Sequence, residues 1–146
     1  MVEVVLATEN MTSVICKIAS TGLDWFPYLP CSAFRAAIRQ GRVLAAVEDN
    51  KVLGYHWFVP KENDYWFGNQ LCVAPQARGR GVGRMLWDAL IEEADSVNAG
   101  LRLKVATTNA IGISLYQSVG FHIVELVGGK NPVYIMERDP RVKTTD

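Results

Sequence analysis

Glycines and arginines alternate in one short segment, Arg78-Gly-Arg-Gly-Val-Gly-Arg84, called the Gly-Arg turn below. An apolar run of strand type precedes it, and a long pattern of helix spacing follows it at once. Glycines permit positive φ and a close approach to the backbone. The N-terminus of the following helix adds free N–H groups and partial positive charge. Together with the three arginine side chains, this arrangement predicts a site for a phosphate or pyrophosphate group.

Two common phosphate-binding motifs do not fit this segment. A P-loop requires Lys-Ser or Lys-Thr after its last glycine, and neither occurs here. The dinucleotide motif G-x-G-x-x-G would need a glycine at position 84 or 86, where the chain has Arg84 and Leu86. The next predicted strand ends Val105-Ala-Thr-Thr and lacks the acidic residue of that fold. The spacing therefore excludes both motifs.

The spacing that fits is R-x-x-G-x-G, at Arg78, Gly81 and Gly83, which closely resembles the cofactor signature of the GNAT superfamily, the acyl-CoA-dependent N-acyltransferases. A second segment, Asn109 to Phe121, resembles that superfamily's N-x-x-A-x-x-L-Y-x-x-x-G-F, with a glycine at position 112 in place of alanine. The resemblance covers about residues 43–137, and loosely the N-terminal helices.

The resemblance implies coenzyme A binding, with acetyl-CoA as acyl donor. In the superfamily the pantetheine arm lies between the splayed fourth and fifth strands, and the Gly-rich turn holds the pyrophosphate. Asn109 would bind pantetheine or lie near the amine; as a residue, it is equally suited to be a helix N-cap. The implied cofactor-binding residues are Leu71, Val73, Arg78, Gly79, Arg80, Gly81, Val82, Gly83, Arg84 and Asn109.

Tyr116 matches the superfamily's tyrosine that protonates the leaving thiolate as general acid. A packed aromatic residue on an amphipathic helix is the alternative. A backbone N–H of the fourth strand, at Val73 or close by, would polarise the thioester carbonyl. Many relatives have a glutamate base in this strand, but residues 64–71 contain none. The candidates that remain are Asp64, Glu62, His56, or a water chain anchored by Asn69 or Gln70, and no base is assigned.

Aromatic residues point to the acceptor. The segment between the first two predicted helices contains Asp24-Trp-Phe-Pro-Tyr28, and Trp57, Trp66 and Phe67 lie on the central strands. An aromatic wall with one carboxylate suits a cationic amine. The alternative is that these rings belong to the core.

The predicted function is N-acetyl transfer from acetyl-CoA to a primary amine of a small molecule or peptide, by direct attack in a ternary complex. The alternative is a non-catalytic acyl-CoA-binding or regulatory module on the same fold. Fifteen Lys and Arg residues balance fifteen Asp and Glu residues. Zero net charge argues against a nucleic-acid partner, and a homodimer is left open.

The elements that must position these residues follow the order β-α-α-β-β-β-α-β-α-β-β. The strands are expected at 2–7, 43–47, 52–59, 65–73, 101–105, 121–127 and 133–137. Helices are expected around 11–19, from an N-cap at Ser32 to Gly41, over 82–97 and over 111–119. This order predicts an α/β fold with a mixed sheet of about seven strands and helices on both faces, as in the GNAT fold. We expect one N-acetyltransferase domain over residues 1–140 and a polar tail over 141–146.

Composition sets the remaining bounds. The chain has 146 residues, of which 49% are hydrophobic and 21% charged, a mix typical of a globular domain. Its three cysteines, Cys16, Cys31 and Cys72, are widely spaced, and we expect reduced, buried thiols in a cytoplasmic protein. Neither cysteines nor histidines have metal-ligand spacing, so no metal site is expected. No apolar run is long enough to predict a membrane span.

Overall fold

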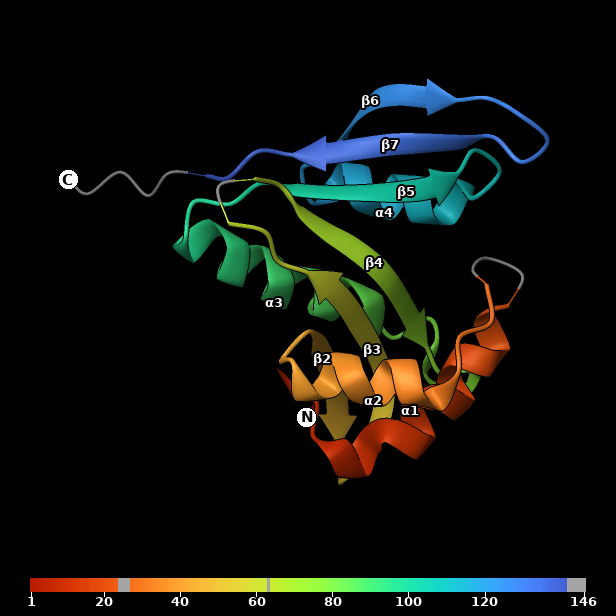
Figure 1. Ribbon diagram of the computed structural model, residues 1–146, viewed down its shortest axis with the longest axis vertical. Helices are drawn as coiled ribbons and strands as arrows, with labels where there is room; N and C mark the ends of the chain where they lie inside the picture. The colour runs from red at the N-terminus through yellow and green to blue at the C-terminus, as the bar shows by residue number, and fades with distance from the viewer. Residues whose placement is uncertain (24–26, 63, 142–146) are drawn as a thin grey trace. The chain divides into compact units, whose positions relative to one another are not determined.

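The computed structural model describes residues 1–23, 27–62 and 64–141 (Figure 1). The strands are β1 (Glu3–Leu6), β2 (Val43–Glu48), β3 (Lys51–Val59), β4 (Trp66–Val73), β5 (Leu101–Ala106), β6 (His122–Val127) and β7 (Val133–Arg138). The helices are α1 (Thr12–Ala19), α2 (Cys31–Arg39), α3 (Val82–Ser96) and α4 (Ala110–Ser118), with short 3-10 helices η1 (Glu9–Met11), η2 (Ser20–Gly22) and η3 (Pro75–Ala77). The predicted order of strands and α-helices is confirmed. Within the described ranges, no helix has both the length and the apolar character needed to cross a bilayer.

The strands form a mixed sheet in the order β1-β2-β3-β4-β5-β7-β6. The pairs β1–β2, β2–β3, β5–β7 and β6–β7 are antiparallel, whereas β4 and β5 are parallel. The parallel pair begins with Trp66 opposite Leu101, so the fourth and fifth strands start side by side. The protein therefore has a mixed α/β fold with a mostly antiparallel sheet.

The chain divides into two compact units, which are described separately. Unit 1 comprises residues 1–58 and 70–89, and unit 2 comprises residues 59–69 and 90–146. Unit 1 contains β1, β2, most of β3, the end of β4 and the Gly-Arg turn. Unit 2 contains the start of β4, β5, α4, β6 and β7. A single domain over residues 1–140 stays a prediction.

In unit 1, helices cover both faces of β3. The ring of Phe34 in α2 lies 5.7 Å from that of Tyr55 and 5.2 Å from that of Trp57. The ring of His56, between those two residues, lies 4.2 Å from Trp87 in α3. Because successive strand residues point to opposite faces, α2 and α3 pack on opposite sides of β3. The predicted helices on both faces of the sheet are confirmed here.

Local sequence sets the conformation of two segments, the turn between β2 and β3 and the start of α2. Asp49 and Asn50 both have positive φ, 51° and 63°, as a two-residue hairpin turn requires. They join β2 to β3, in the gap between the strands expected at 43–47 and 52–59. The predicted N-cap at Ser32 is wrong, since α2 already starts at Cys31 after Pro30. Pro30 has φ −69° and ψ 154°, so the chain enters the helix directly after this proline and Ser32 lies in the first turn.

The expectation of three reduced, buried thiols is wrong for two of the cysteines. Cys16 in α1 and Cys31 at the start of α2 form a disulfide, with their Cα atoms 5.8 Å apart. That separation lies in the usual range for disulfides, and it arises because α1 and α2 pack against each other. Cys31 is exposed and Cys16 half-buried. Cys72 is free and buried, as predicted.

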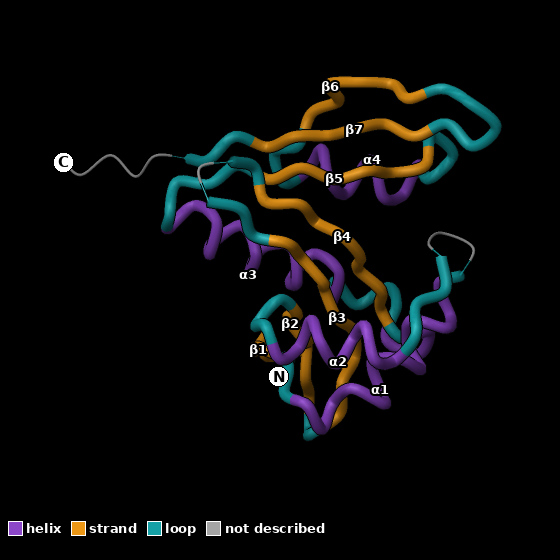
Figure 2. Tube along the Cα trace, viewed as in Figure 1, coloured by secondary structure: helices purple, strands orange, loops and turns teal. Residues whose placement is uncertain are grey.

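In unit 2, β5, β7 and β6 run side by side with α4 next to them (Figure 2). One face of β5 and β7 is buried and carries Leu101, Leu103, Val105, Met136 and Arg138. The pairing places Leu101 opposite Arg138 and Leu103 opposite Met136. An arginine therefore belongs to the interior face of this unit, which neither composition nor periodicity indicated.

Candidate functional site

The Gly-Arg turn in unit 1 leaves its backbone open. It follows η3, and Gly79 and Gly81 both have φ +80°, a region that favours glycine. A Cβ placed on either glycine would meet nothing within 4 Å. A ligand can therefore approach the main chain of the turn closely, as the sequence predicts.

Helix α3 begins directly after this turn. The N–H of Met85 donates to the carbonyl of Gly81 at 3.0 Å, which is the first helical bond. The N–H groups before Met85 have no partner within the helix, and the first turn of α3 carries no acidic side chain. The partial positive charge of the helix end is therefore not neutralised by its own sequence. This geometry suits an anion with several oxygen acceptors.

Arg78 is exposed and folds back along the surface of unit 1. Its Nε donates to the carbonyl of Val73 at 3.1 Å, and its Nη2 donates to Oγ1 of Thr21 at 3.3 Å. The side chain therefore joins the end of β4 to η2 and stabilises the start of the turn. The carbonyl of Val73 is therefore already engaged by Arg78. Leu71 and Val73 are both half-buried.

The other two arginines carry surface ion pairs. Nη2 of Arg80 donates to Oε1 of Glu48 at 2.9 Å, and Nε of Arg84 lies 3.9 Å from Oδ2 of Asp88. The hydrogen bond from Arg80 lowers the pKa of the Glu48 carboxyl. Since the side chain of Arg80 is 47% exposed, its guanidinium remains accessible to a ligand at the turn.

In unit 2, Asn109 is the N-cap of α4. Its Oδ1 accepts from the N–H of Gly112 at 3.0 Å, so the capping interpretation is confirmed. A Cβ at position 112 would lie 2.6 Å from Nδ2 of Asn109. Because glycine has no Cβ, the side-chain amide of Asn109 can lie over the first turn of α4. A contact of Asn109 with pantetheine stays a prediction.

Tyr116 lies in the last part of α4 and is half-buried. Its ring contacts that of Phe121 edge-on, with centroids 6.1 Å apart. Burial raises the pKa of the Tyr116 phenol above its ordinary value. The phenol is therefore protonated at neutral pH, which is the form that a general acid requires. Packing and proton donation are compatible here.

The residues weighed as a base lie in different surroundings. His56 is 1% exposed, and burial lowers its pKa to about 3, so it is a neutral core residue. Gln70 is buried too, and its Oε1 accepts from the hydroxyl of Tyr55 at 2.5 Å. The side chain of Asn69 lies outside the described part of the structure. His56 and Gln70 are therefore core side chains, and neither is suited to act as a base or to anchor a water molecule.

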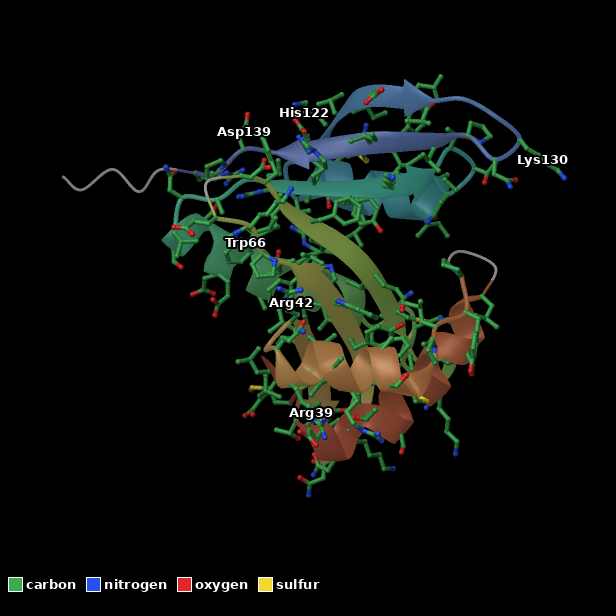
Figure 3. The ribbon with its side chains drawn as sticks, in the orientation of Figure 1. Arg39, Arg42, Trp66, His122, Lys130 and Asp139 are labelled. Carbon is green, nitrogen blue, oxygen red and sulfur yellow. A yellow bond between two sulfur atoms is a disulfide. The ribbon has the colours of Figure 1, made fainter. Side chains whose placement is uncertain are left out.

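Asp64 and Glu62 line a pocket of about 790 Å³ in unit 2, where β4 and β5 begin. Its wall also includes Tyr65 and Trp66, the latter labelled at the start of β4 in Figure 3. The N–H of Tyr65 donates to Oδ1 of Asp64 at 2.7 Å, which lowers the pKa of that carboxyl. Asp64 is therefore a weaker base than an ordinary aspartate, and Glu62 is exposed.

The aromatic wall is only partly visible. Trp57 packs against Phe34 in unit 1, and Tyr28 is 73% exposed. The predicted members Asp24, Trp25 and Phe26 lie outside the described residues. Over the ranges that the structure describes, no cluster of three or more His, Cys, Asp or Glu side chains could hold a metal ion.

Sequence reasoning missed the partners of these residues. Thr21 and Glu48 contact arginines 57 and 32 positions away, and no local motif marks either of them. Asp95 and Arg138, which form a part-buried ion pair 43 positions apart, were missed for the same reason. Only the fold brings such pairs together.

Comparison with known proteins identifies the family. The model of the Acetyltransferase (GNAT) family matches residues 17–121. A mycothiol acetyltransferase of Tsukamurella paurometabola is 33% identical over 104 residues, which are 69% of this chain and 34% of that protein. A [ribosomal protein bS18]-alanine N-acetyltransferase of Salmonella typhimurium is 42% identical over 53 residues, 36% of each chain. The chain thus spans about a third of the length of these two relatives.

Solved structures agree on the fold. Ard1 from Thermoplasma volcanium superposes with a TM-score of 0.86 at 20% identity, covering 96% of this chain and 98% of that one. The acetyltransferase yncA from Salmonella typhimurium, solved with its cofactor acetyl-CoA, has a TM-score of 0.83 at 20% identity and covers 100% and 98%. The family model spans more than half of the chain, and its range includes both the Gly-Arg turn and residues 109–121. The chain therefore belongs to the GNAT family of acetyltransferases.

Proposed function

We propose that the protein transfers an acetyl group from acetyl-CoA to a primary amine of a small molecule or a peptide. The observation that carries this proposal is the Gly-Arg turn, with two glycines at φ +80° and open space above them. The first turn of α3, free of acidic side chains, adds N–H groups and partial positive charge. The pyrophosphate of coenzyme A has the charge and the oxygen acceptors that such a site needs.

In this proposal the main chain of Leu71 and Val73 binds the pantetheine amides. The N–H of the next residue, Ala74, donates to the carbonyl of Leu53 in β3 at 2.7 Å. Because successive N–H groups of a strand point to opposite sides, we assign the N–H of Val73 to the cofactor side. Residues 79–84 bind the pyrophosphate through their N–H groups, helped by the charge of Arg80 and Arg84. Arg78 acts by holding the turn. Asn109 lies near the pantetheine while capping α4.

Chemistry follows by direct attack. The amine nitrogen bonds to the thioester carbon, the carbon–sulfur bond breaks, and the thiolate takes the proton of the Tyr116 hydroxyl. The attacking nitrogen gives up one proton to solvent, and Tyr116 regains one, so the products are an amide and free coenzyme A. The raised pKa of Tyr116 supports its role as donor. No base is assigned, and deprotonation through water suits a chain whose β4 carries no glutamate.

The acceptor class draws support from the names of relatives, which include an alanine N-acetyltransferase and mycothiol acetyltransferases. A homodimer and a cytoplasmic location stay predictions of the sequence. The test is a panel of amines and N-terminal peptides incubated with acetyl-CoA while free thiol is measured. Thiol release that requires both substrates supports the proposal. Tight coenzyme A binding without turnover on any amine would instead favour a non-catalytic acyl-CoA-binding module.

A further inference from the structure

Arg138 lies at the end of β7 on the buried face of unit 2, and its side chain is only 5% exposed. All three of its guanidinium nitrogens donate. Nη1 and Nη2 bond to the two carboxylate oxygens of Asp95, in the last part of α3, at 2.8 and 3.2 Å. Nε donates to the carbonyl of Val119 at 3.0 Å. The fork therefore joins three elements at one point.

The carbonyl of Val119 belongs to the turn that ends α4. In the same turn, the N–H groups of Val119 and Phe121 both donate to the carbonyl of Tyr116, at 3.2 and 3.0 Å. Gly120 has φ +103°, and a Cβ there would lie 3.3 Å from Nε of Arg138. Glycine lets the guanidinium reach this turn. Arg138 thus bonds to Val119, the same residue whose N–H donates to the carbonyl of Tyr116.

The carbonyl of Val119 at the end of α4 does not need an arginine held by a carboxylate as its hydrogen-bond donor. Water or a glycine turn can satisfy the last carbonyls of a helix, whereas burying the guanidinium of Arg138 has a desolvation cost that its partners must offset. Its rigid, bidentate geometry fixes direction as well as distance. A fixed direction matters for a side chain that must place a proton, because small displacements of reacting groups reduce rates strongly.

We propose that Arg138, held by Asp95, is a positioning residue for Tyr116, setting the end of α4 so that the phenol meets the leaving sulfur. The inference rests on the proposed function, in which Tyr116 is the proton donor. Arg138 itself contacts no substrate in this scheme. Removing its fork should change the orientation of the phenol and leave cofactor binding in unit 1 unaffected.

The test is a double-mutant cycle between Arg138→Lys and Tyr116→Phe. Arg138→Lys keeps the charge but loses the fork. We expect kcat to fall about tenfold while the KM for the amine and the Kd for coenzyme A change less than about twofold. In the Tyr116→Phe background the same substitution should have almost no further effect, because no phenol remains to be positioned. The matched control is Arg39→Lys, in the exposed Arg39–Glu9 pair of unit 1, which should leave kcat unchanged.

A second readout does not depend on turnover. With tyrosine ring carbons labelled for NMR, Arg138→Lys should move the Tyr116 signals, and Arg39→Lys should not. If Arg138→Lys does not fold, Asp95→Asn, which retains a hydrogen-bond acceptor, takes its place in both measurements. An equal loss of kcat in both backgrounds, or unmoved Tyr116 signals, would overturn the positioning role. Full turnover by Tyr116→Phe would show that Tyr116 is not the proton donor and would refute this inference as well. A wild-type protein that is inactive on every amine would instead refute the proposed function.

Discussion

Arg80 bonds to a carboxylate in the structure and would bond to a phosphate in the proposed complex. Its guanidinium bonds to Glu48, whose carboxylate also lies 3.6 Å from the N-terminal amine of Met1. A phosphate at the Gly-Arg turn would compete with Glu48 for the same cation. The strength of cofactor binding should therefore depend on a carboxylate that does not belong to the motif.

Glu48→Gln should tighten coenzyme A binding by about two- to threefold at low salt, because it frees the exposed guanidinium of Arg80 from its half-buried partner. The gain should shrink as salt screens the attraction between Arg80 and phosphate. Isothermal titration at two salt concentrations measures both effects. Glu93→Gln, which removes an exposed carboxylate elsewhere on α3, is the matched control. Equal affinities of Glu48→Gln and wild type at low salt would show that Arg80 does not contact the cofactor.

Tyr116→Phe keeps the ring and its contact with Phe121 but removes the hydroxyl. Turnover should fall roughly 100-fold, the lower end of general-acid effects, and the free energy of unfolding should change by less than about 1 kcal/mol. The loss should appear in kcat, because the hydrogen bond strengthens as charge builds on sulfur. Single-turnover kinetics on an accepted amine, beside thermal unfolding, measure the two quantities. Undiminished turnover would make Tyr116 a packing residue.

Among the elements, β3 and β4 approach each other closely at Gly54, beside the part of β4 that is assigned to pantetheine. A Cβ on Gly54 in β3 would lie 3.0 Å from the carbonyl oxygen of Cys72 and 3.2 Å from Cα of Val73. Both neighbours are backbone atoms, which cannot rotate away. The position of Val73, whose N–H is assigned to pantetheine, therefore depends on a residue without a side chain.

Gly54→Ala should destabilise the protein by about 1–3 kcal/mol, as overpacking does, and should weaken coenzyme A binding because Val73 must shift. Denaturant unfolding and calorimetry measure these effects on the same samples. Gly128→Ala is the control, since a Cβ at Gly128 meets nothing within 4 Å. A folded Gly54→Ala protein with wild-type stability and affinity would contradict the role given to this contact.

The elements themselves could be predicted because their signals are local. The apolar spacing in α3 and the break at residues 98–100 are set by neighbours in sequence, and so is the turn at Asp49 and Asn50. The N-cap at Ser32 failed because a preceding proline sets the helix start. The Cys16–Cys31 disulfide and the Asp95–Arg138 pair could not be predicted, since helix packing and strand register bring those residues together.

For the molecule as a whole, His56 makes the free energy of unfolding depend on pH. Burial lowers its pKa to about 3, from an ordinary value of 6.5. Between these two values the unfolded chain binds a proton that the folded protein does not. The stabilisation is complete above pH 6.5 and is lost as the pH falls toward 3.

The free energy of unfolding should therefore fall by up to about 1.4 kcal/mol per pH unit below pH 6.5. Urea unfolding between pH 7 and pH 4.5 measures the slope in a range where most carboxylates are still ionised. His56→Leu should flatten it, whereas His122→Gln, at the exposed histidine of β6, should leave it unchanged. An identical slope in His56→Leu would show that His56 does not titrate on unfolding.

The Gly-Arg turn is proposed to bind the pyrophosphate of coenzyme A, and a pair of isosteric variants at Gly81 isolates the effect of charge at this position. Asn and Asp both tolerate positive φ, so Gly81→Asn and Gly81→Asp should fold alike and differ only in charge. Calorimetry should show coenzyme A binding at least about tenfold weaker to Gly81→Asp than to Gly81→Asn, because a carboxylate would face the phosphates. Equal affinities in the two folded variants would contradict the claim and place the cofactor elsewhere.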